Sequence, residues 1–76
     1  MKITADMITN EQIVELRNAT FGTGDHELMA TCHDAMPGST RWVEESDGGE
    51  VRLISAADRR EARARCAEIL NQRGAK

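Results

Sequence analysis

The stretch STRWVEESDGGEVRLIS, residues 39–55, decides the fold class because it interrupts an otherwise helical sequence. Two runs with β-strand character, at 41–45 and 50–54, flank the turn sequence Ser-Asp-Gly-Gly at 46–49. Asp-Gly and Gly-Gly supply the positive φ angles that tight hairpin turns need, so the stretch predicts a β-hairpin. Because a two-stranded ribbon is unstable alone, we expect it to pack on the helices. The expected contacts are Trp42 or Val43, Val51, and Leu53 or Ile54.

A helix is predicted upstream of this ribbon, over about residues 10–19. Thr9 is a suitable N-cap, and Gln12 three positions later completes a capping box. Ile13 and Leu16 follow at helical spacing and give the helix an apolar side. The helix should end near the glycines that follow it.

A second helix is predicted over about residues 26–36, with Asp25 as its N-cap. Leu28, Cys32 and Met36 recur every four residues and form its apolar stripe. A Pro-Gly dipeptide directly after the stripe should end the helix. The short link to the preceding helix predicts an antiparallel helical hairpin.

A third helix is predicted downstream of the ribbon. Ser55 is its expected N-cap, with Asp58 at the capping-box position, and Gly74 is expected as the left-handed residue after its end. Its apolar stripe consists of Ala62, Cys66, Ile69 and Leu70.

Together these elements predict a small, mostly helical α+β domain in the order α-α-β-β-α, with residues 1–76 forming a single domain. Near the N-terminus, Lys2–Thr4 has the character of a short strand that could join the sheet. The predicted core contains Ile13, Leu16, Leu28, Cys32, Met36, Ala62, Cys66, Ile69 and Leu70.

Composition and charge narrow the class of protein. The chain is 39% hydrophobic and 30% charged, which is typical of a globular domain. It begins without a basic region followed by an apolar run, and no apolar stretch approaches the roughly 20 residues of a membrane span. We therefore expect a cytoplasmic protein with reduced cysteines and no membrane partner.

Charge is divided unevenly along the chain. Residues 1–50 carry 3 basic and 10 acidic side chains, whereas residues 51–76 carry 7 basic and 3 acidic ones. The acidic residues of the ribbon, together with its Trp, form a candidate partner-binding surface, whose carboxylates could imitate DNA phosphates or dock on an Arg-rich groove of a protein. The alternative is a solvated hairpin whose charges discourage aggregation. The candidate partner-binding residues are Trp42, Glu44, Glu45, Asp47 and Glu50.

The basic half suggests a different site. An arginine-rich helix can bind phosphates, so Arg59, Arg60, Arg63 and Arg65 are the alternative nucleic-acid-binding residues. Interleaved Glu61 and Glu68, the missing aromatic stacking residues and the acidic chain argue against direct nucleic-acid binding. Otherwise these arginines form a solvated face, or pair with the acidic half of the same chain or of a second copy in a homodimer.

No residues converge on a reaction. Cys32 and Cys66 lie on apolar stripes, where free cysteine packs as a small hydrophobe. Neither they nor His26 and His33 have the spacing of a metal site, and the histidines are expected at the surface. We therefore expect no catalytic residue, no metal and no cofactor.

Three blocks of the sequence carry a resemblance: ITNEQIVELR (8–17), GDHELMATCHDAM (24–36) and ARARCAEIL (62–70). In this order they resemble short uncharacterised proteins of bacterial genomes, phages and plasmids. The resemblance implies a compact helical scaffold and no particular activity. Compared with the common short form of these proteins, residues 1–6 are an N-terminal extension and residues 37–55 a β-hairpin insert. By analogy with small phage proteins, it suggests a mobile-element protein that inhibits a host protein or nucleoprotein complex without catalysis, such as an anti-CRISPR protein.

Overall fold

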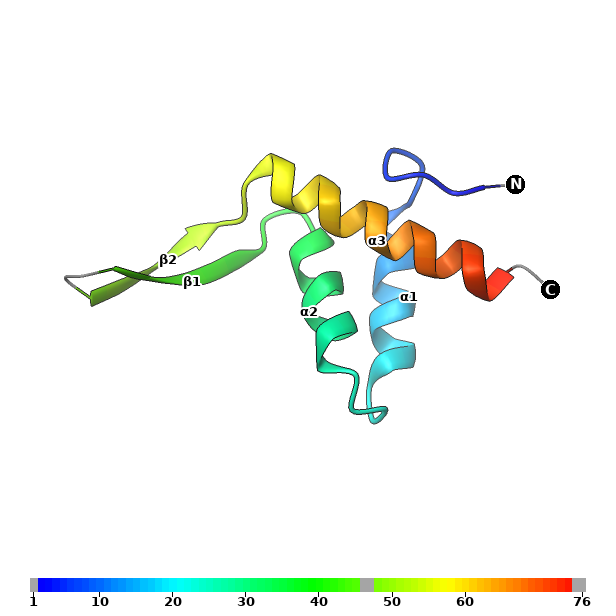
Figure 1. The fold of residues 1–76 in the computed structure, drawn as a ribbon, viewed down its shortest axis with the longest axis horizontal. Coiled ribbons are helices and arrows are strands. Elements are labelled where there is room, and N and C mark those ends of the chain that lie inside the picture. Colours follow the sequence, from blue (N-terminus) through cyan, green and yellow to red (C-terminus); the bar gives the residue numbers. More distant parts are fainter. Residues whose placement is uncertain (1, 46–47, 75–76) are drawn as a thin grey trace.

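The computed structural model of the protein describes residues 2–45 and 48–74. The predicted α+β architecture and the order α-α-β-β-α are confirmed. The elements are α1 (Asn10–Thr20), α2 (His26–Ala35), β1 (Thr40–Glu45), β2 (Gly48–Leu53) and α3 (Ala56–Gly74). In Figure 1, α3 runs across one end of the α1–α2 pair, and the two strands extend away from the helices.

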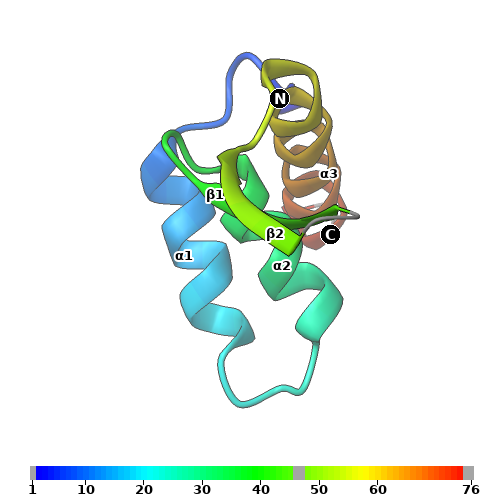
Figure 2. The same cartoon turned by 90° about the vertical axis from the view of Figure 1, so that its left-hand side faces the viewer.

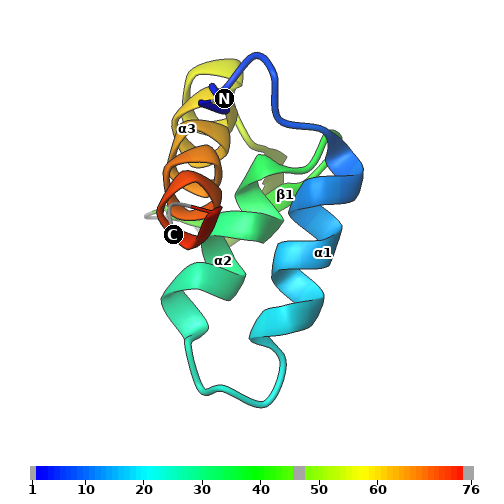
Figure 3. The same cartoon turned by 90° about the vertical axis from the view of Figure 1, so that its right-hand side faces the viewer.

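The first two helices form the predicted antiparallel hairpin. Figures 2 and 3 show them side by side, joined by a loop at the end far from α3. The capping box of α1 is confirmed: Gln12 N donates to Thr9 Oγ1 (3.1 Å), and Thr9 N donates to Gln12 Oε1 (2.8 Å). Asp25 caps α2 by accepting a bond from Leu28 N (3.0 Å). These caps satisfy N-terminal amides that have no partner within their helices.

The third helix begins as predicted and ends differently. Ser55 Oγ accepts a hydrogen bond from Asp58 N (3.1 Å), which is the geometry of an N-cap. Gly74 is the last residue of α3, and it does not adopt a positive φ. The prediction of a left-handed cap at Gly74 was therefore wrong, because the helix continues through this residue.

The core lies where the three helices meet. Six predicted residues are buried there: Ile13, Leu16, Leu28, Cys32, Ala62 and Cys66. The three other predicted residues, Met36, Ile69 and Leu70, are only partly buried at its margin. The cluster also contains Ile8, Ala35 and Ala67, which the prediction lacked. Small residues at these helix contacts let the backbones approach closely, so the core needs few large side chains.

The ribbon is paired more completely than predicted. Its strands are antiparallel, and the pairing runs from Thr40 opposite Leu53 to Glu45 opposite Gly48. Gly48 and Gly49 are therefore strand residues rather than part of a four-residue loop. The other two residues of the expected turn lie outside the described part of the chain.

The expectation that the ribbon packs on the helices was wrong for Trp42, Val51 and Leu53, whereas the burial expected for the alternative residue, Ile54, is confirmed. Trp42, Val51 and Leu53 expose 59%, 61% and 70% of their surface. Ile54, directly after β2, is the buried anchor, and its N–H donates to Ser39 O (3.1 Å) across the base of the ribbon. The strands contact each other far more than they contact any helix, and the molecule measures 50 × 28 × 17 Å.

The short strand expected at Lys2–Thr4 is also absent from the described structure, and the sheet has two strands. Ile3 instead pairs with the side-chain amide of Asn71 in α3. Ile3 N donates to Asn71 Oδ1 (2.8 Å), and Asn71 Nδ2 donates to Ile3 O (2.8 Å). The amide thus supplies the donor and acceptor that a neighbouring strand would otherwise provide.

No helix in the described ranges combines the length and apolar character needed to cross a membrane.

A matched pair of leucine substitutions tests the separation of core and ribbon. Leu16 is 2% exposed and Leu53 is 70% exposed. We expect Leu16→Ala to lower the free energy of unfolding by about 2–5 kcal/mol because it leaves a cavity. Leu53→Ala should change it by no more than about 0.5 kcal/mol. Urea denaturation followed by circular dichroism measures both; similar losses would contradict an independent ribbon.

Candidate functional site

The pairing register divides the ribbon into two faces. Residues opposite each other in an antiparallel pair share a face, and the faces alternate along each strand. Because Trp42 pairs with Val51, one face consists of Thr40, Trp42, Glu44, Gly49, Val51 and Leu53. We call this the apolar face. The opposite face carries Arg41, Val43, Glu50 and Arg52, and we call it the charged face.

The apolar face is ordered around Trp42. A Cβ atom built at Gly49 would overlap the indole ring, so the ring lies directly over this glycine. Gly49 is the diagonal neighbour of Trp42 on the same face. An aromatic ring that covers a strand glycine shields its backbone and is itself held in place. Trp42 is therefore positioned by the ribbon and still exposed to solvent.

The predicted acidic surface is divided between the faces. Glu44 belongs to the apolar face, is exposed and has no ion-pair partner among the described residues. Glu50 belongs to the charged face and forms an ion pair with Arg52. The side chain of Glu45, and Asp47 as a whole, lie outside what the structure describes. The structure thus brings Trp42 together with Glu44 and separates both from Glu50.

The charged face is joined to the helices at its base. Arg41 forms ion pairs with Asp34 of α2 (2.9 Å) and Asp58 of α3 (3.7 Å). All three side chains retain solvent contact, so each pair contributes little to stability by itself. Together, the two ion pairs hold the start of β1 against α2 and α3.

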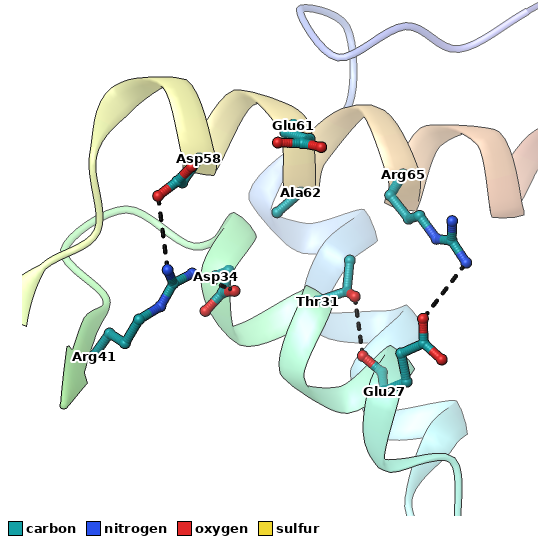
Figure 4. Close-up of a pocket in the computed structure, with 8 residues that line it drawn as sticks. All are labelled: Glu27, Thr31, Asp34, Arg41, Asp58, Glu61, Ala62 and Arg65. Carbon is teal, nitrogen blue, oxygen red and sulfur yellow. Dashed lines mark hydrogen bonds and ion pairs between the residues drawn. The ribbon is translucent and has the colours of Figure 1, made fainter. Parts of the chain in front are cut away.

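These side chains also line a groove between the base of the ribbon, α2 and α3 (Figure 4). The groove has a volume of about 260 Å³, and a further ion pair, Arg65 with Glu27 (3.8 Å), lies along it. Its lining residues are Glu27, Thr31, Asp34, Arg41, Asp58, Glu61, Ala62 and Arg65. In the described part of the chain, no three or more His, Cys, Asp or Glu side chains are grouped to hold a metal ion. The groove is therefore a polar boundary between β1, α2 and α3.

Arg63 makes the most extensive contacts of the four candidate nucleic-acid-binding arginines. Its guanidinium donates to the carbonyl oxygens of Ile8 (2.6 Å) and Ala35 (3.0 Å). A third bond reaches Asn10 Oδ1 (3.0 Å). One side chain of α3 thus holds the segment before α1, the start of α1 and the end of α2.

The neighbouring arginines also have partners within the chain. Arg59 donates to Met36 O (3.2 Å) at the end of α2, and to the carbonyl of Ile54 (3.4 Å). Arg60 donates to both carboxylate oxygens of Asp6 (2.6 and 3.1 Å), and this contact lowers the pKa of Asp6. Arg60 with Asp6 and Arg65 with Glu27 match the expected pairing with the acidic half of the same chain. Arg59 and Arg63 instead donate to carbonyl oxygens and to an Asn side chain. Fewer of their donors remain for phosphate groups.

The two cysteines are buried next to each other between α2 and α3. Both are free thiols, and both are fully buried. Burial raises the pKa of Cys32, and burial together with the adjacent Cys32 raises the pKa of Cys66 to about 12. Thiols held neutral in this way are poor nucleophiles. His26 and His33 lie at the surface as predicted.

Comparison with known proteins leaves the site to be judged on its geometry: no family model matches the chain, and no match was found among curated proteins or solved structures. The resemblance of the three sequence blocks to short phage and plasmid proteins therefore stays a prediction.

Replacing Arg63 tests its role in joining the helices. We expect Arg63→Met to reduce the free energy of unfolding by about 2–3 kcal/mol, because two carbonyls and one side-chain amide lose a charged donor. Arg65→Met is the matched control: it removes a guanidinium from the same helix, and among residues 2–45 and 48–74 it breaks only an exposed 3.8 Å ion pair. Its cost should be below about 0.5 kcal/mol. Equal stabilities in urea for the two variants would show that Arg63 is not a structural residue.

The cysteine pair predicts a loss of stability at alkaline pH. The ordinary pKa of a thiol is 9.0, whereas that of Cys66 is raised to about 12. The unfolded chain therefore loses this proton first, and the free energy of unfolding should fall as pH rises from about 9 toward about 12. Below this window the contribution is constant.

The chain contains no Tyr, which leaves few other groups that titrate in the window. Urea denaturation at about pH 8 and about pH 10 should show a smaller decline for Cys66→Ala than for the unmodified chain. The same decline in both would contradict the assignment to this thiol.

Proposed function

We propose that the chain is a non-catalytic protein-binding protein and that the apolar face of its hairpin is the contact surface. The observation that carries the proposal is the exposure of Trp42, Val51 and Leu53 on one side of a projecting ribbon. Exposed apolar side chains that contribute nothing to a core are typical of interaction sites. Trp is also among the residues that most often dominate binding energy.

The ribbon supports this proposal through its shape and its order. It extends away from the helices, so a partner can reach the apolar face without contacting the core (Figure 1). The indole of Trp42 is already held over Gly49, which reduces the entropy lost on binding. The proposed surface keeps Trp42 and Glu44 from the sequence prediction, leaves out Glu50, which lies on the charged face, and adds Val51 and Leu53.

The proposed biological form of this activity is inhibition of a host defence complex by steric docking, as in anti-CRISPR proteins. It rests on the resemblance of the three sequence blocks alone. The broader class, a protein binder, rests on the apolar face. Nucleic-acid binding through α3 ranks lower because Arg59, Arg60 and Arg63 already donate to groups within the chain.

Affinity capture from a nuclease-treated bacterial lysate tests the proposed function. We expect the tagged chain to retain one host protein or complex, and the double variant Trp42→Ser, Leu53→Ser to lose at least about 90% of it. The matched control is Glu50→Gln with Arg52→Gln, which changes the charged face only. Circular dichroism should show that both variants fold, since all four side chains are exposed.

If the double variant retains the partner as well as the control does, the apolar face is not the contact surface. Recovery of the bait alone, at a mass that rises with concentration, would instead support self-association.

A further inference from the structure

We propose that the partner presents a shallow apolar groove with a cationic side chain, Arg or Lys, at the end that receives Glu44. This inference rests on the proposed function, and it adds the chemistry and the layout of the surface that the partner must offer.

The charge of Glu44 on the apolar face indicates that the partner must supply a cationic group. Glu44 is the charged member of that face; the other members, Thr40, Trp42, Gly49, Val51 and Leu53, are neutral. Glu44 is exposed and has no ion-pair partner within the described ranges. A partner that covers Trp42 also removes water from the region around Glu44. A carboxylate that loses water without gaining a cation or a donor opposes binding.

The positions along the ribbon determine where the cation must lie. Leu53 is at the base, the Trp42–Val51 pair is in the middle, and the Glu44–Gly49 pair is toward the tip. Successive pairs on one face are two residues apart, which is about 7 Å. The cation should therefore lie about 7 Å beyond the site that receives the indole, in the direction of the tip.

The charged face of the ribbon indicates that the groove on the partner is shallow. Arg41 is paired with Asp34 and Asp58, and Glu50 with Arg52. Burying these groups would require new partners for both signs of charge, whereas leaving them in water costs nothing. A shallow groove or wall that covers one face of the ribbon fits this distribution, and a slot that encloses both faces does not.

The same distribution argues against a second copy as the occupant. Two apolar faces packed against each other would bring two Glu44 carboxylates into the contact and no cation from either face. The basic groups near the base are already engaged: Arg41 lies on the charged face, and Arg59 donates to Met36 O and Ile54 O. A foreign protein can supply the missing positive charge.

The test uses a photo-crosslinking amino acid in place of Thr40, which is exposed on the apolar face, in the full chain expressed in bacteria. The crosslinked protein is identified by mass spectrometry, the attachment site is mapped, and the partner is purified. The expected attachment site is an apolar groove with Arg or Lys within about 10 Å. An attachment site beside acidic residues and without a cation would overturn the proposal.

Binding measurements with the purified partner then separate Glu44 from Glu50. We expect Glu44→Gln to raise the Kd at least about fivefold and to weaken the dependence of binding on salt. Glu50→Gln should change the Kd less than about twofold. After the partner's cation is replaced by Ala, Glu44→Gln should have no further effect.

The two proposals fail in different ways. If Trp42→Ser with Leu53→Ser abolishes binding while Glu44→Gln leaves the Kd within about twofold, the contact surface stands and the cationic groove is wrong. If the crosslinker joins only two copies of the chain, both proposals are overturned.

Discussion

The guanidinium of Arg63 is the interaction on which the arrangement of the helices depends. It donates to Ile8 O before α1, to Asn10 Oδ1 at the start of α1 and to Ala35 O at the end of α2. In the sequence, Ile8 and Asn10 lie more than fifty residues from Arg63, and Ala35 lies more than twenty-five residues from it. Helix termini carry unsatisfied backbone groups, and a planar fork with several donors can satisfy more than one of them. Apolar contacts in a core of Ile, Leu, Cys and Ala are non-directional. The hydrogen bonds of Arg63 have a preferred geometry and therefore orient the helices relative to one another.

The arginines of α3 and the ribbon make different use of their side chains: the arginines bond within the chain, and the ribbon exposes an apolar face to solvent. Arg59, Arg60 and Arg63 bind the chain to itself, so much of the basic character of α3 is used internally. The ribbon does the opposite: it pairs with itself, anchors through Ile54 and leaves its apolar face in water. The strong charge asymmetry of the sequence therefore reflects folding contacts in its basic half, whereas the proposed contact surface is apolar with a single acidic member.

The sequence predicted the elements well because their ends carry local chemistry. Thr9 with Gln12, Asp25, and Ser55 with Asp58 are caps whose partners lie three residues away, so spacing alone reveals them. Ile8 was missed although it precedes the N-cap of α1 and Ile13 is the fifth residue after it, the spacing of a hydrophobic staple. The two faces of the ribbon could have been derived from the sequence once Trp42 was paired with Val51. The position of the ribbon away from the helices could not, because it depends on tertiary contacts, such as that of Ile54 with Ser39, that no local sequence pattern encodes.

The independence of the ribbon from the core has a consequence for how such a chain can change. Because Trp42, Val51 and Leu53 are exposed and lie outside the helical core, substitutions among them change the surface of the ribbon with little effect on core packing. With the apolar face as the proposed contact surface, the three-helix body serves as a carrier, and the ribbon can diversify without repacking of the core. Recombination that exchanges the ribbon between its joining residues Ser39 and Ile54 would then transfer the proposed contact surface as a unit.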